Sequence, residues 1–291
     1  MKKFVLKRFF QIIPTLFIVS ILVFGAMHLA PGDPASMLMG RAAATNPEGL
    51  KALKQKMGLD EPFIFQYFIW LKNVLNGDLG KSNRSGEDVL SLVNERLPAS
   101  IELLTISFLV SIIFSLPFGI FAALYQNKVL DTVIMTFSVV GVAVPGFWLG
   151  LALILLFSVY LKILPASGYI PFFDDPIGNL KRVLLPSITL SVYLIATFSR
   201  FLRSDMLNVL NQDYVRTARS KGLTEKLIII RHSVPNALIP FITIVGVEIG
   251  VLLGGMIIVE HVFGWSGLGW LTLQAVYNRD YPLVQGCVMI T

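Results

Sequence analysis

The amino-acid sequence predicts an all-α integral membrane protein, and three observations lead to this fold class. Of the 291 residues, 55% are hydrophobic and only 14% are charged. The mean hydropathy of +0.72 also lies well outside the balance of a soluble globular domain. Apolar runs recur whose length matches the roughly 20 residues that a helix needs to cross the hydrocarbon core of a bilayer.

Five segments are long and apolar enough to form membrane-spanning helices. They are residues 9–30, 99–125, 132–161, 183–202 and 236–263. A sixth apolar run begins near Tyr281 and reaches Thr291 without a polar stop, so we expect the last helix to be truncated there. The first run follows basic residues, as a secretory signal does, but it exceeds the about 7–15 apolar residues of such a signal. We interpret it as the first span, with a cleaved signal peptide as the alternative.

The distribution of basic residues predicts a cytoplasmic N-terminus. In that orientation the cytoplasmic segments 1–11, 126–131 and 200–235 carry 12 Lys and Arg residues, whereas the short outer loops carry four. Basic residues in short loops favour the cytoplasmic side, so this bias sets the orientation. The net charge of +6 is then an orientation signal that also suits an anionic membrane surface, and nucleic-acid binding is not predicted.

Residues 31–98 form a long extracytoplasmic region between the first and second spans. Within it, residues 47–58 are typical of a short amphipathic helix that ends at Gly58 in a left-handed conformation. The strongly aromatic segment 62–76 is expected to lie along the membrane interface, where Tyr and Trp are favoured.

No grouping of residues indicates a catalytic or metal site. Gly80-Lys81-Ser82 resembles the end of a phosphate-binding loop, but Leu75 stands where the first glycine of that loop belongs. The glycines of segment 264–269 follow a membrane helix rather than a strand, so they predict a tight turn and no dinucleotide site. The three histidines lie far apart in the sequence, and no nucleophile clusters with a base. With Cys287 as the single cysteine, an intramolecular disulfide is excluded.

The fifth predicted span carries the candidate residues for a pathway or for helix packing: Gly246, Glu248, Gly250 and Gly254. Glycines at every fourth position allow another helix to approach closely. An ionisable group in lipid costs at least about 2.5–3.5 kcal/mol, so Glu248 is expected to face protein or water. It either contacts substrate or pathway water or forms a hydrogen bond to a neighbouring helix. Similar small-residue spacings occur at Ser111, Ser115 and Gly119 and at Gly146 and Gly150.

A basic, helix-forming stretch separates the fourth and fifth spans. Asp213 is expected to cap a helix of about two turns over residues 214–221, which Gly222 ends. Thr224 is expected to cap a second helix that runs toward Pro235. Such short helices are marginal in water, and the stretch includes Tyr, Val, Ala and Leu, so we expect the pair to dock on another surface.

The stretch resembles the cytoplasmic "EAA" loop of binding-protein-dependent ABC importers, in which Glu-Ala-Ala precedes a glycine and a proline follows that glycine by thirteen positions. Gly222 and Pro235 match that spacing, and Ala218 matches the second alanine. Arg216 and Thr217 replace Glu-Ala, and His232 and Val234 also depart from the pattern before the proline.

Other segments resemble the dipeptide, oligopeptide and nickel permease branch of that family. They are Pro31-Gly-Asp-Pro34, Gly58-Leu-Asp-Glu-Pro62, Gly77-Asp-Leu-Gly80, Leu97-Pro-Ala-Ser100, Arg203-Ser-Asp-Met-Leu207, Phe263-Gly-Trp-Ser-Gly-Leu-Gly269 and Arg279-Asp-Tyr-Pro282. Ser266 replaces an expected proline, which affects only the rigidity of that turn. Together, in this order, the segments cover nearly the whole chain.

The resemblance implies a six-helix permease subunit in a bacterial or archaeal cell membrane. Residues 1–30 would hold the N-terminus and first helix, 31–98 the extracytoplasmic region, and 99–291 the permease core with its coupling loop at 203–235. Its implied partners are a second permease, two cytoplasmic ATPases and an extracytoplasmic binding protein. This chain would bind no cofactor and catalyse no reaction, since ATP and Mg would bind the ATPases. The ATPase-coupling residues would be Asp213, Tyr214, Arg216, Thr217, Ala218, Arg219, Lys221, Gly222 and Pro235.

The cargo that the resemblance favours is a short peptide, driven through by ATPases coupled to the 213–235 loop. Nickel or another metal chelate and glutathione remain alternatives, because the signatures report the machinery rather than the cargo. A proton-coupled secondary carrier that uses Glu248 is the alternative from another class, but the repeated halves usual in such carriers are not visible.

Overall fold

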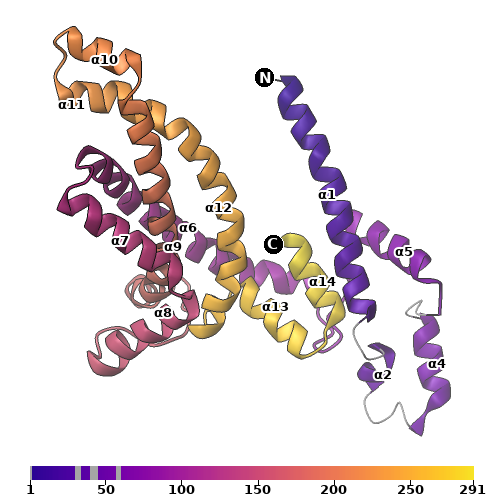
Figure 1. The fold of residues 1–291 in the computed structure, drawn as a ribbon. Helices are drawn as coiled ribbons and strands as arrows, with labels where there is room; N and C mark the ends of the chain where they lie inside the picture. The colour runs from indigo at the N-terminus through magenta and orange to yellow at the C-terminus, as the bar shows by residue number, and fades with distance from the viewer. Residues whose placement is uncertain (1, 30–33, 40–44, 57–59) are drawn as a thin grey trace. The chain divides into compact units, whose positions relative to one another are not determined.

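The computed structural model describes residues 2–29, 34–39, 45–56 and 60–291 (Figure 1). Within those ranges the chain is helical, and its β-type pairing is one isolated bridge between Lys81 and Asp88. Residues 31–33 of the 31–34 motif, the helix end expected at Gly58 and the start of the 58–62 motif lie outside the described residues.

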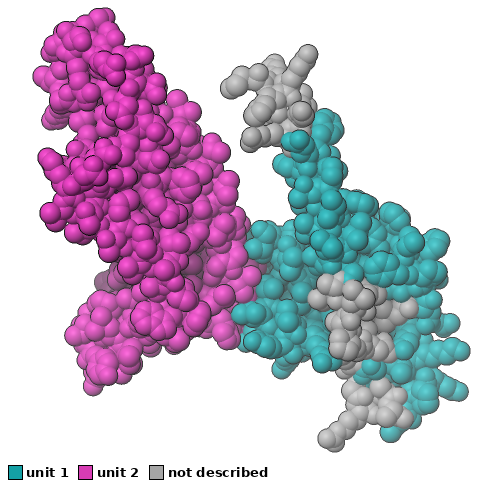
Figure 2. Space-filling view, in the orientation of Figure 1, with its two compact units in different colours: residues 1–97, 271–291 teal, residues 98–270 magenta. Residues whose placement is uncertain are grey.

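Two compact units divide the chain (Figure 2). Residues 1–97 and 271–291 form the first, which contains α1 (Lys2–Leu29), α2 (Pro34–Met39), α4 (Pro47–Lys56), α5 (Phe63–Leu75) and α14 (Tyr281–Ile290). Residues 98–270 form the second, with α7 (Val129–Ala143), α8 (Gly146–Leu153), η1 (Ile154–Tyr160), α9 (Pro176–Leu210), α10 (Asp213–Ser220), α11 (Glu225–Leu227), η2 (Ile228–Ser233) and α12 (Val234–Val262). Both α6 (Val89–Leu124) and α13 (Leu268–Tyr277) include residues of each unit.

Several described helices are suited to cross a membrane. Three of them, α6, α9 and the continuous helix from Glu225 to Val262, are long and apolar enough, and a bent pair makes a fourth candidate. In α1 and α14 the described apolar stretches, Phe10–Gly25 and Tyr281–Ile290, are shorter. Each expected span therefore coincides largely with helix, and the all-α membrane fold class is confirmed.

The expected third span, residues 132–161, is not one straight helix. Its two halves, α7 and α8 with η1, meet at a bend of 103°. Pro145 causes the break, because proline cannot continue the hydrogen-bond ladder and keeps the preceding residue out of the helical region. Val144 is accordingly extended, with φ −77° and ψ 122°. The single-helix prediction was wrong at this proline.

The centre of the second unit is α9, which contacts α7, α8 and α12. Close packing there depends on small residues on the neighbouring helices. A Cβ atom at Gly119 of α6 would lie 2.7 Å from the Leu202 Cβ, and one at Gly141 of α7 would lie 2.9 Å from that of Ala196. Figure 1 shows α10 and α11 at one end of α9 and α12, with α8 toward the other end.

In the first unit, the aromatic helix α5 packs on α1. The Tyr67 hydroxyl lies 2.7 Å from the Ser20 Oγ in a buried hydrogen bond, and the Phe24 ring contacts Phe63, Tyr67 and Trp70. Large apolar side chains of α5 remain exposed on its other side: Ile64, Phe65, Phe68, Ile69 and Leu75. This two-sided pattern suits a helix at a membrane interface, which stays a prediction.

Candidate functional site

The loop between α9 and α12 contains the short helix α10, followed by a tight turn. Gln212, not Asp213, is the N-cap of α10, with φ −73° and ψ 151°, and no side-chain cap bond forms there. Asp213 is instead the first helical residue, where its carboxylate still faces the positive end of the helix dipole. The expected cap was therefore misplaced by one residue. Gly222 has a φ of +76°, as expected for a residue that ends a helix in the left-handed region.

A small apolar core holds this loop together. Val215 and Ala218, on one face of α10, are buried against Ile228 of η2, and Leu223 packs beside them. The Leu223 amide donates to the Ala218 carbonyl at 3.3 Å, which fixes the reversal of the chain. Val215 and Ala218, which were expected on a docking face, therefore pack within the loop instead. Tyr214 remains 45% exposed.

An ion pair reinforces the same reversal. The Arg219 Nε donates to the Glu225 Oε1 at 2.7 Å, and its second guanidinium nitrogen donates to the Glu225 Oε2 at 3.3 Å. This contact raises the pKa of the Arg219 guanidinium further, so its charge is permanent. Because both side chains are largely exposed, the pair contributes little to stability and mainly orients the turn.

The remaining predicted coupling residues are exposed on this loop. They are Asp213, Arg216, Thr217, Lys221 and Gly222, with Pro235 exposed on the first turn of α12. The second helix of the loop does not end before Pro235, since α11, η2 and α12 form one continuous helix. The turn at residues 221–224 therefore separates α10 from a membrane-spanning helix. Whether these residues contact an ATPase stays a prediction.

An ion pair between α7 and α9 was not predicted from the sequence. Arg203 donates through Nε and Nη2 to the two carboxylate oxygens of Asp131, at 2.6 Å and 2.7 Å. The Asp131 carboxylate also accepts from the main-chain amide of Asn127 at 2.9 Å, which fixes the start of α7. The Asp131 side chain is 6% exposed and that of Arg203 is 22% exposed. Such a bidentate contact orients both helices.

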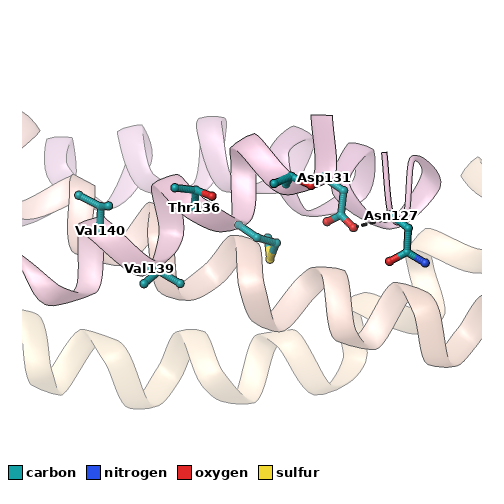
Figure 3. Close-up of a pocket in the computed structure, with 7 residues that line it drawn as sticks. Asn127, Asp131, Thr136, Val139 and Val140 are labelled. Carbon is teal, nitrogen blue, oxygen red and sulfur yellow. Dashed lines mark hydrogen bonds between the residues drawn. The ribbon is translucent and has the colours of Figure 1, made fainter. Parts of the chain in front are cut away.

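A hollow of about 410 Å³ follows the exposed side of α7 from this ion pair (Figure 3). Asn127 and Asp131 form its polar end, and Val139 and Val140 form its apolar end. In Figure 3 the dashed line marks the bond from Asn127 to Asp131. The carboxylate oxygens are already occupied by Arg203 and Asn127, so Asp131 acts as a structural group here rather than as a free ligand for cargo.

The four candidate residues of α12 do not share one surface. Successive helical residues are rotated by about 100°, so Glu248 lies on the opposite face from Gly246 and Gly250. A Cβ atom added at Gly246, Gly250 or Gly254 would meet no atom within 4 Å among the described residues. Glu248 is half-buried, and its Oε2 is enclosed without a hydrogen-bond partner in the described part of the chain. Packing of the glycine face and a pathway role for Glu248 stay predictions.

A second buried carboxylate joins α12, the turn after it and α6. Glu260 is fully buried, accepts from the Ser100 hydroxyl at 2.6 Å and accepts from the Trp270 amide at 2.9 Å. The Ser100 Oγ in turn accepts from the Leu268 amide at 2.7 Å, and the Trp265 indole donates to the Ala99 carbonyl at 2.8 Å. The segments 97–100 and 263–269, both noted in the sequence, are thus parts of one contact.

In the first unit, Asp280 plays a comparable role for the segment around residue 80. Its carboxylate accepts from the Ser82 hydroxyl at 2.5 Å and from the main-chain amide of Asn83 at 3.0 Å, and Asp280 is 1% exposed. Arg84 also donates to Asn278. The residues that imitate a phosphate-binding loop therefore belong to a structural contact with the 279–282 motif.

Known proteins resemble the chain along nearly its whole length. Residues 115–291 match the family described as the inner membrane component of binding-protein-dependent transport systems, and residues 1–105 match the N-terminal family of the same membrane components. A protein of Brucella abortus strain 2308, named as a peptide transport system permease, is 40% identical over 289 residues, which are 99% of this chain and 91% of that protein. The glutathione transport system permease protein of Escherichia coli strain K12 is 39% identical over 290 residues, covering 100% of this chain and 92% of that protein.

Proposed function

The chain belongs to the family of inner-membrane components of binding-protein-dependent transport systems, and from this premise we propose that it forms half of the translocation pathway of an ATP-driven importer of short peptides. A transport permease subunit is not itself an enzyme, and a binding protein is a general partner in such systems. The proposal adds a second permease, two cytoplasmic ATPases that bind ATP and Mg, and a cell membrane location with the N-terminus in the cytoplasm. Because the chain belongs to this family, we no longer interpret it as a proton-coupled secondary carrier.

The observation that carries the coupling part of the proposal is the continuity of the loop with α12. The 213–235 loop has its own small core and an exposed outer surface, and after the turn at residues 221–224 its second helix continues without a break into the membrane-spanning helix. A push from an ATPase on α10 would reach α12 through the contacts of Val215 and Ala218 with Ile228, which lies in the continuous helix. An ATP-driven change between inward-open and outward-open states requires a mechanical connection of this kind.

Gly222 provides the test of this coupling role. A valine there must adopt φ +76°, a conformation that β-branched residues avoid at a cost of about 1–3 kcal/mol, so Gly222→Val should reshape the turn. We expect loss of ATPase co-purification or of substrate-stimulated ATP hydrolysis, with membrane insertion unchanged. Gly77→Val is the matched control, because Gly77 has φ +83° and, like Gly222, no described atom near its missing Cβ. Unchanged coupling in Gly222→Val would refute the assignment.

The cargo needs a separate experiment. The relatives named for peptide and for glutathione transport are 40% and 39% identical to this chain, so identity does not separate the two cargoes. Glutathione is itself a small peptide, and short peptides are therefore the common chemistry. Calorimetry of the partner binding protein with dipeptides, oligopeptides, glutathione and Ni²⁺ would decide. Tight binding of Ni²⁺ alone would replace the peptide assignment.

A further inference from the structure

An apolar groove lies between α6, α7 and α9, on the side of α7 opposite the hollow of Figure 3. It has a volume of about 610 Å³, and four phenyl rings line it. They belong to Phe114, Phe118, Phe121 and Phe137. The polar residue of its lining is Ser191, whose hydroxyl donates to carbonyl oxygens of Ser187 and Ser107 instead of facing a ligand. The described lining thus offers an occupant apolar surface only.

The length of the groove matches one leaflet of a bilayer. Along α6 it extends from Val110 to Phe121, a rise of about 16 Å at about 1.5 Å per residue. Half of the roughly 30 Å hydrocarbon core is about 15 Å. A membrane-spanning helix of a partner subunit would need a surface of twice that length, whereas one acyl chain fits this depth.

The charge at the end of the groove indicates the headgroup. Tyr125 and Lys128 belong to the turn that connects α6 to α7, between Phe121 and Leu130 of the groove lining. The Lys128 ammonium lies 5.5 Å from the centre of the Tyr125 ring, so this turn carries a cation. The nearby carboxylate of Asp131 is bound by Arg203 and does not neutralise Lys128. A basic group at a membrane surface attracts anionic lipid.

We propose that this groove binds one acyl chain of an anionic phospholipid, whose phosphate pairs with Lys128. In the proposed orientation the lipid comes from the cytoplasmic leaflet, so this assignment of side rests on the function proposed above. The binding itself needs only that α6, α7 and α9 lie in a membrane. The lipid would cover the exposed phenyl rings of Phe114, Phe121 and Phe137.

The test uses the full chain, purified with its partner subunits in nanodiscs that contain phosphatidylglycerol with a diazirine near the end of one acyl chain. After illumination, mass spectrometry identifies the labelled peptides. We expect label on peptides of α6 and α7 that line the groove. Wild-type label confined to other helices would overturn the proposal without any variant.

Two matched pairs of variants sharpen this experiment. Val133 lines the groove and is 59% exposed, so Val133→Trp should fill the groove and reduce its labelling by about tenfold. Val139→Trp places the same bulk on the opposite face of α7, where Val139 is 62% exposed, and should leave the labelling unchanged. Equal labelling in both variants would show that the groove is not the site. Size-exclusion chromatography checks that each variant still assembles.

The headgroup contact is tested with Lys128→Gln, which should lower phosphatidylglycerol labelling about fivefold and leave phosphatidylcholine labelling unchanged. Lys162→Gln removes a cation from the loop after η1 and is the control. Equal phosphatidylglycerol labelling in both would overturn the role of Lys128. A photoreactive benzoylphenylalanine at Val133 adds an independent readout: a cross-link to lipid supports the proposal, and a cross-link to the second permease replaces lipid with a subunit interface.

Discussion

The ion pair between Asp131 and Arg203 predicts a large and specific loss of stability when one partner is neutralised. Asp131→Asn keeps the size of the side chain but removes the charge that accepts two hydrogen bonds from Arg203, at 2.6 Å and 2.7 Å. Breaking a buried pair in this way costs about 3–5 kcal/mol, because the remaining charge stays buried. Arg203 keeps 22% exposure, so water can solvate part of it, and we expect the lower end of that range, about 3 kcal/mol.

The measurement is a double-mutant cycle with Asp131→Asn, Arg203→Met and the combined variant. Unfolding of the purified protein in lipid–detergent micelles, followed by tryptophan fluorescence, gives the free energy of each. We expect a coupling energy of about 2 kcal/mol between the two sites. Arg200→Met, which removes an exposed arginine of the same helix, should change the stability by less than about 0.5 kcal/mol. A coupling energy below about 0.5 kcal/mol would refute the inference that this pair holds α7 on α9.

Two further substitutions test the packing of the second unit in the same unfolding assay. Glu260→Ala leaves the buried Ser100 hydroxyl and the half-buried Trp270 main-chain amide without their acceptor and should cost about 3 kcal/mol; a cost under 1 kcal/mol would mean that water replaces the carboxylate. Gly119→Val would place its Cβ 2.7 Å from the Leu202 Cβ and should cost about 1–3 kcal/mol. Gly246→Ala adds a Cβ on an open face and should be nearly neutral. Equal costs for the two glycine substitutions would contradict the packing of α6 on α9.

The helices could be located from the sequence because hydrophobic runs of a fixed length are a local property. The break in the third predicted span could have been predicted from Pro145, because proline disfavours the helical conformation at the residue before it, here Val144. The sequence pattern does not show whether such a proline kinks a helix or bends it by 103°, because the bend depends on what the second half packs against. Here α8 contacts α9 and α12.

The coupling loop was predicted in outline and corrected in detail. A glycine that ends a helix is a local signal, and Gly222 adopts the expected left-handed conformation. The start of α10 was misplaced by one residue, because Asp is a favoured N-cap residue, whereas here the extended N-cap backbone falls at Gln212 and no side-chain cap bond forms. That Val215 and Ala218 are buried within the loop depends on Ile228, a contact across the turn.

By itself, the sequence determined the membrane class, the family signatures and the register of the 213–235 loop, because hydropathy, spacing and turn chemistry all act over a few residues. Only the tertiary structure decided which donor each buried carboxylate binds. Asp131 and Arg203, Ser100 and Glu260, and Ser82 and Asp280 are separated by 72, 160 and 198 residues. The physical reason is that a buried carboxylate is stable only with donors brought to it by folding, and one sequence carries no record of those distances.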